Sequence, residues 1–192
     1  MATATRADRL HFTGNDEADA LIARDPFALL IGFALDQQVP VTTAFSGPLK
    51  IKQRLGTIDA RKLAKTDPGQ LEGAFREKPA VHRFPGTMAR RVQELAQFIS
   101  DEYGGNAERV WATAKTGQEL RERLGELPGF GEMKVKATLA VLAKRFGVRP
   151  SGIDEVLPNH PTLGDVDSAE ALAEYQAKKR AHKARLRAQA SS

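Results

Sequence analysis

The most apolar stretch of the chain covers residues 26–35 and leaves almost no polar face. Asp25, directly before it, is a preferred N-cap residue, and Pro26 suits the first position of a helix. A helix that is apolar on all sides is usually buried. Three polar residues, Asp36–Gln38, follow at once, and we call them the corner. The pattern therefore predicts a buried helix that ends in a polar corner.

Helical spacing also dominates the rest of the chain. Asp59 and the pair Asp67-Pro68 mark the starts of two short helices. Residues 39–56 are predicted as a helix that is interrupted at Ser46-Gly47-Pro48, a turn signal. A longer amphipathic helix ends at Gly104-Gly105, and its apolar residues recur at steps of four, three and four: Met88, Val92, Leu95 and Ile99.

The chain is predicted to be all-α, because no stretch shows a strong strand pattern. Its 192 residues suit one domain, or two small lobes around one cleft. We expect a helical domain over residues 15–155. Residues 156–192 are expected to form a loop and a basic tail, either disordered or weakly helical, because the segment 150–170 is rich in Pro, Gly and Asp.

Charge and composition narrow the function. The chain has no cysteine, which excludes disulfides and cysteine-bound iron–sulfur clusters, and its four histidines are too far apart in sequence to suggest a metal site. The net charge is +5, but six Lys and Arg lie in the tail Lys178–Ser192, which leaves 23 basic and 24 acidic residues elsewhere. Such a basic tail either adds affinity for nucleic acid or only solubilises the terminus. The sequence shows neither a secretory signal nor a membrane-length apolar run, so we expect a cytoplasmic protein.

The most informative segment is LRERLGELPGFGEMKVKATLAVL, residues 120–142. It predicts two helices joined by a tight turn, Leu127–Gly131, which we call the hairpin. Glycine lets a backbone approach another surface closely. The first N–H groups of the second helix have no internal partners and form an anion site that suits a DNA phosphate. Lys134 would add positive charge there; an ordinary turn between helices is the alternative.

Three motifs resemble those of a known family. LPGFGEMK resembles the hairpin of the helix-hairpin-helix DNA glycosylases, a superfamily that includes endonuclease III and the adenine–mismatch, alkyladenine and 8-oxoguanine glycosylases. ALDQQVPVTTAF is similar to the family's polar corner, and RFPGTMARRVQELAQFI to a helix that follows it. The motifs occur in the family's order over about residues 20–150. The resemblance implies a two-lobed helical glycosylase fold, here without an iron–sulfur cluster.

The resemblance also implies an activity. It is that of a base-excision repair glycosylase, which hydrolyses the N-glycosidic bond of a damaged or mismatched base flipped out of double-stranded DNA. Gln38 matches the family residue that fills the gap, and its amide can replace part of a lost base-pairing pattern. Gln37 is a second candidate, and the alternative is that both only cap the helix. Asp36 departs from the small residue that is usual in the family.

Excision of a base needs a group that stabilises an oxocarbenium-like transition state or activates water, and a carboxylate does both. The family has an aspartate after the second hairpin helix. Asp154 matches it, at a spacing slightly longer than usual, with Glu155, Asp165 and Asp167 as reserves. Bifunctional members have a lysine where this chain has Met133, so we expect a monofunctional enzyme.

The candidate DNA contacts lie in three segments. Besides Gln37 and Gln38 they are Arg83, Arg90, Arg91, Leu127, Pro128, Gly129, Phe130, Gly131 and Lys134. No cofactor and no protein-bound metal are required, although the resemblance implies a monovalent cation on the hairpin carbonyls. We expect a monomer that acts on double-stranded DNA without a membrane, at the nucleoid if the protein is bacterial. Two alternatives stay open: a non-catalytic hairpin protein that binds distorted or abasic DNA, and a helical protein–protein adaptor.

Overall fold

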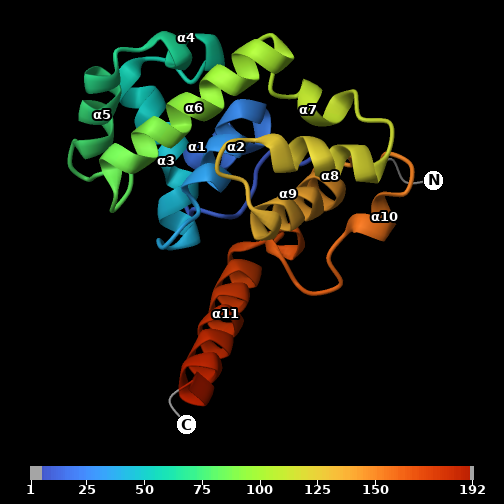
Figure 1. The fold of residues 1–192 in the computed structure, drawn as a ribbon. Helices are drawn as coiled ribbons and strands as arrows, with labels where there is room; N and C mark the ends of the chain where they lie inside the picture. Colours follow the sequence, from blue (N-terminus) through green and yellow to red (C-terminus); the bar gives the residue numbers. More distant parts are fainter. Residues whose placement is uncertain (1–5, 191–192) are drawn as a thin grey trace.

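A computed structural model describes residues 6–190 (Figure 1). Within this range the chain is helical and has no strand, apart from one isolated bridge between Thr116 and Ser151, which confirms the all-α prediction. The elements are α1 (Asp16–Arg24), α2 (Pro26–Leu35), α3 (Val41–Leu55), α4 (Ala60–Lys65), α5 (Pro68–Arg76), α6 (Pro85–Tyr103), α7 (Arg109–Ala112), α8 (Gly117–Glu126), α9 (Glu132–Arg145), α10 (Ile153–Val156), the 3-10 turn η1 (Leu163–Asp165) and α11 (Ala169–Ala190).

The predicted helix starts are confirmed. The Asp25 side chain accepts hydrogen bonds from the N–H groups of Phe27 and Ala28, and the side chains of Asp59 and Asp67 cap α4 and α5 in the same way. Every residue of α2 after Pro26 is buried, as its lack of a polar face predicts. At the other end of a helix, α6 stops at Gly104, which takes a left-handed φ of 61°.

The interruption expected at Ser46-Gly47-Pro48 is wrong, because α3 runs through it without a break. A proline inside a helix removes one backbone hydrogen bond and costs about 3 kcal/mol. Packing offsets that cost here. Gly47 and Pro48 are both buried, and a Cβ on Gly47 would lie 2.4 Å from Cδ1 of Leu35 in α2. Gly32 of α2 makes a second close fit, since a Cβ there would lie 2.4 Å from the ring of Phe45.

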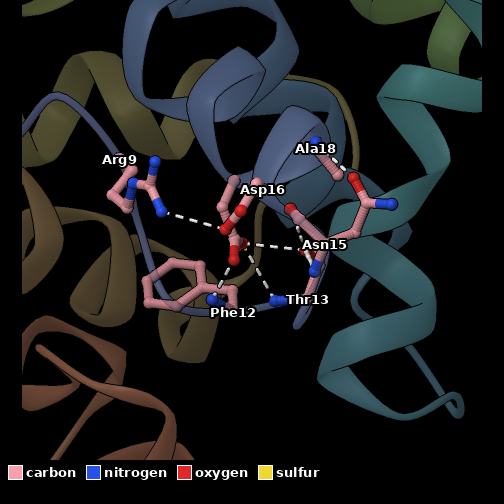
Figure 2. A network of polar contacts seen from close by, with 7 residues as sticks. Arg9, Phe12, Thr13, Asn15, Asp16 and Ala18 are labelled. Atoms are coloured by element: carbon pink, nitrogen blue, oxygen red, sulfur yellow. Dashed lines mark hydrogen bonds and ion pairs between the residues drawn. The ribbon is translucent and has the colours of Figure 1, made fainter.

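The N-terminal segment is fastened to α1 by polar contacts (Figure 2). The buried carboxylate of Asp19 accepts hydrogen bonds from the N–H groups of Phe12 at 3.1 Å and Thr13 at 3.0 Å. Asn15 caps α1 by accepting from the N–H of Ala18 at 2.9 Å, and Arg9 pairs with Asp16 at 2.9 Å. This network lets Phe12 pack its ring edge-to-face against Phe45, at 5.0 Å between centroids, in the core.

The helices pack mainly in two sets, α1 to α6 and α7 to α11, and one hydrophobic core joins them. The expected loop at 150–170 contains α10 and η1. The tail is helical, because α11 continues to Ala190, and every residue from Ala177 onward is exposed, so this part projects from the body (Figure 1). No helix in the described range is both long and apolar enough to cross a membrane. Residues 1–5, on which the signal-segment expectation partly rests, lie outside that range.

Candidate nucleic-acid interface

The corner exposes two glutamines at the end of the buried helix α2. Gln37 and Gln38 are both exposed, and the N–H of Gln37 donates to the carbonyl of Leu35 at 2.7 Å. Gln38 has a φ of 57° and is the one described non-glycine residue with a positive φ. A left-handed conformation costs a residue with a Cβ about 1–2 kcal/mol. The fold therefore holds Gln38 in a strained conformation at an exposed position, which is typical of functional sites.

His82 supports the corner through hydrogen bonds to the backbone. Its Nε2 donates to the carbonyls of Leu35 at 3.1 Å and Gln37 at 3.0 Å, while its Nδ1 accepts from the N–H of Phe84 at 3.0 Å. These partners require the neutral ring with hydrogen on Nε2. Burial lowers the pKa of His82, and the two carbonyl bonds only partly oppose the shift. The ring is thus buried and makes three hydrogen bonds.

The hairpin connects α8 and α9 with the predicted boundaries. Gly129 has a φ of 81°, in the left-handed region that favours glycine. Gly131 has an ordinary φ of −79°, and a Cβ added to it would meet nothing within 4 Å. Among residues 6–190, no side chain caps α9 at Gly131, so its first N–H groups stay available to a ligand. An exposed glycine that the fold itself does not require leaves room for another molecule to approach the backbone.

A side chain that contacts DNA must be exposed. The side chains of Leu127 and Phe130 are not. Both are buried in the core, because they anchor the turn against it. Pro128 is half-buried, whereas Gly129 and Gly131 are exposed. The hairpin can therefore contact DNA through its glycine backbone and the start of α9, and not through its apolar side chains.

Arg91 of α6 joins the hairpin to the corner. A Cβ on Gly129 would lie 2.7 Å from Cδ of Arg91, so this side chain rests directly on the glycine backbone. Nη1 of Arg91 then donates to Oε1 of Gln37. The three motifs that are far apart in the sequence thus meet at one side chain.

Lys134 points inward instead of toward a phosphate. Its Nζ donates to the carbonyl of Ala34 at 3.0 Å and so caps the C-terminal end of α2, where a positive charge is favourable. Burial, together with the nearby charge of Arg91, lowers the pKa of Lys134 to about 8. The expected phosphate contact is therefore replaced by a bond that ties α9 to the corner. A sequence shows that Lys134 is in the first turn but not which carbonyl comes within its reach.

Asp36 is the carboxylate of the corner. It is half-buried, and burial raises its pKa, while Lys179 of α11 and Lys134 oppose that shift. The charge of Asp36 also acts on the half-buried Tyr175 of α11. The nearby positive charges of Lys134 and Lys179 are favourable for a carboxylate at this position, where the resembling family usually has a small residue.

A basic groove opens at the N-terminal end of α6. It has a volume of about 470 Å³, and its lining includes Arg83, Arg90 and Phe84, which is 40% exposed. Arg76 and Glu72 also line it and pair with each other at 2.6 Å. The guanidinium of Arg83 lies over the Phe84 ring at 4.8 Å from its centroid. Arginine and an exposed aromatic ring suit a phosphate and a base respectively. Arg83 and Arg90 are therefore both exposed at this groove.

Asp154 lies at the other end of the hairpin helices. Its carboxylate pairs with Arg149 at 2.5 Å on the surface, and its neighbour Ile153 packs against Gly117, the first residue of α8. The hairpin follows the last residue of this ten-residue helix, which is about 15 Å long. The structure therefore does not bring Asp154 to the corner.

A cavity of about 300 Å³ near Arg149 is lined in part by Trp111 and Phe146, and Trp111 is buried, as expected of a core residue.

The reserve carboxylates have other surroundings. Asp165 pairs with Lys144 at 2.5 Å and forms a capping box with Thr162 at η1. Burial acts to raise the pKa of Asp165, but the bonds to Lys144 and Thr162 outweigh it and lower the pKa below the ordinary value. Glu155 and Asp167 are exposed. In the described part of the chain, no three His, Cys, Asp or Glu side chains form a group that could hold a metal ion.

Comparisons with models of known protein families, with curated proteins and with solved structures found no match. The likeness to the helix-hairpin-helix glycosylases therefore rests on the three sequence motifs alone.

Proposed function

We propose that this chain binds double-stranded DNA at a base that is distorted or extruded from the stack. The observation that carries the proposal is the contact of Arg91 with both Gly129 and Gln37. Through this contact the glycine backbone of the hairpin lies near the exposed amide of Gln37, which supports the proposal. Arg83 and Arg90 add positive charge, which supplies most of the sequence-independent affinity for DNA.

In the proposed complex the hairpin and the corner have different roles. The N–H groups at the start of α9 bind a phosphate, with Gly131 allowing the backbone to come close. Gln38 enters the duplex and offers its amide to the bases left without a partner. Its strained backbone and its exposed side chain support this role, because strained residues are typical of functional sites.

Base excision is the chemistry that we propose for this surface. The enzyme would be a monofunctional DNA glycosylase, since Met133, which is 80% exposed, stands where bifunctional relatives of the resembling family have a lysine. Asp36 is better placed than Asp154 to act on a base extruded at the corner. Burial raises the pKa of Asp36, which is the direction that favours a general acid for the leaving base.

A second candidate function is binding without catalysis, in which the protein recognises distorted or abasic DNA. The position of Asp154 favours it, because the carboxylate expected from the family spacing lies at the far end of α8 and pairs with Arg149. A protein–protein adaptor is the third, and it predicts that the hairpin glycines do not matter for DNA.

One set of assays separates these functions. Labelled duplexes that each carry 8-oxoguanine, uracil, an alkylated purine or a mismatched adenine would be incubated with wild type, Asp36→Asn and Asp154→Asn, then analysed with and without alkali. Strand breaks that appear only after alkali and are lost with Asp36→Asn support excision at the corner. Loss with Asp154→Asn alone would contradict the role of Asp36.

Binding gives the matching readout for the non-catalytic functions. Tight binding to an abasic duplex without excision of any base would favour recognition alone. Unchanged binding after replacement of both Gly129 and Gly131 by valine, in a protein shown to be folded by circular dichroism, would favour the adaptor.

A further inference from the structure

Helix α11 leaves the body as a charged rod. From Ala177 to Ala190 every residue is exposed, and this 14-residue part is about 21 Å long. Glu174 pairs with Lys178 at 2.6 Å, and no acidic residue follows it in the chain. The exposed part carries six Lys and Arg residues: Lys178, Lys179, Arg180, Lys183, Arg185 and Arg187. We call Ala177–Ala190 the arm.

The arm begins beside the corner. Tyr175 is half-buried near Asp36, and Nζ of Lys179 lies 6.0 Å from the centroid of the Tyr175 ring. Residues four apart lie on the same side of a helix. Lys179 and Lys183 therefore continue the side of α11 that Tyr175 presents to the corner. In Figure 1 the arm extends away from the body next to the start of α9.

The positive charge of the arm determines which kind of partner can bind it. Like charges four residues apart destabilise a helix, and the arm has such a pair in Lys179 and Lys183 and contains no acidic residue of its own. It also lacks the apolar stripe with which a helix docks on a protein surface, because its positions between the charges are mostly alanine. A polyanion with regularly spaced charges would relieve the repulsion along the whole arm.

We propose that the arm binds the phosphate backbone of the same DNA duplex whose extruded base lies at the corner. This inference rests on the proposed function, because the arm adds contacts to a duplex already held by the hairpin and the corner. At 3.4 Å per phosphate on each strand, the 21 Å of the arm spans about six base pairs beyond the corner. The arm contacts carry no sequence information and lengthen the footprint on DNA.

The test compares two double variants that each remove two positive charges. Lys183→Gln with Arg185→Gln changes the arm, and Lys62→Gln with Lys65→Gln changes exposed residues of α4, on the opposite side of the body from the arm (Figure 1). Affinity for a 25-base-pair abasic duplex would be measured by fluorescence anisotropy from about 50 to 200 mM salt. Each lost phosphate contact lowers the slope of log K against log salt by about 0.9.

We expect the arm variant to lose about 1.8 of this slope and to bind roughly tenfold more weakly near 150 mM salt, while the α4 variant keeps the wild-type slope. Equal slopes for wild type and the arm variant would overturn the proposal that the arm binds DNA, while leaving the proposed function intact. Equal losses in both variants would also overturn it, as an effect of net charge. Self-association of wild type that the arm variant loses, at an unchanged slope, would assign the arm to a second copy of the chain. If wild type binds no duplex at all, the proposed function itself fails.

Discussion

Cδ of Arg91 lies 2.7 Å from the point where a Cβ on Gly129 would stand, so the arginine side chain occupies the space that any other residue would need. The same arginine binds the side chain of Gln37. A change at the hairpin is therefore transmitted to the corner through Arg91, although no hairpin residue needs to contact the corner itself.

Gly129→Ala should destabilise the protein and weaken DNA binding together. The left-handed φ costs about 1–2 kcal/mol with a Cβ present, and the methyl group displaces Arg91. Gly125→Ala is the matched control, since it lies in α8 with open space around its Cβ position and should stabilise the protein by about 0.5–1 kcal/mol. Urea unfolding and anisotropy measure both effects; a Gly129→Ala variant as stable as wild type would contradict the close fit.

Gln38→Gly should separate stability from recognition. Glycine adopts a positive φ without strain, so the free energy of unfolding should stay equal or rise by up to about 1 kcal/mol. The ratio of affinities for abasic and intact duplexes should fall, because the inserted amide is gone. Gln53→Ala, an exposed change in α3, serves as the control and should leave that ratio alone. A ratio that is equal in all three proteins would remove Gln38 from the proposed site.

His82 should make the protein less stable in mild acid. Its pKa is lowered in the folded state, so below about pH 6.5 the unfolded chain takes up a proton that the folded chain refuses, and stability falls until the pH reaches the folded pKa. Urea unfolding of wild type and His82→Gln between pH 5 and 8 measures this slope. The slope should be smaller in the variant and unchanged in His182→Gln, a histidine on the exposed arm.

Lys134 should affect the stability of the folded protein at alkaline pH. Between its folded pKa of about 8 and the ordinary lysine value near 10.4, the unfolded chain holds more protons, so this group makes stability rise with pH. The free energy of unfolding at pH 9.5 minus that at pH 7.5 should be lower in Lys134→Met than in wild type. Lys136→Met, which removes a surface pair with Glu132, should keep the wild-type difference.

Local chemistry in the sequence predicts where most helices begin and end. Asp25, Asp59 and Asp67 cap their helices because a cap needs only residues a few positions away. Pro48 misleads the same reasoning, since the packing that keeps α3 continuous comes from Leu35 in another helix.

The site could be predicted only where backbone geometry fixes it. The hairpin boundaries are right, because Gly129 must take a positive φ. The direction of Lys134 is not predictable, since its partner, Ala34, is 100 residues away in sequence. The hydrogen bond of His82 to Leu35 likewise spans 47 residues. Asp154 shows the limit of spacing, which counts residues but does not tell which way the chain turns after α9.

The fit of Gly32 against Phe45 and of Gly47 against Leu35 holds α2 against α3 at two points, each of which joins a residue before the corner to one after it. The corner is thus a short connection between two helices whose relative position is fixed by close packing. Natural variation in this region should accordingly be paired: a bulkier residue at position 32 calls for a smaller one at position 45, and one at position 47 for a smaller one at position 35. Where such pairs drift apart, the geometry of the two glutamines would change in variants whose surface residues are all intact.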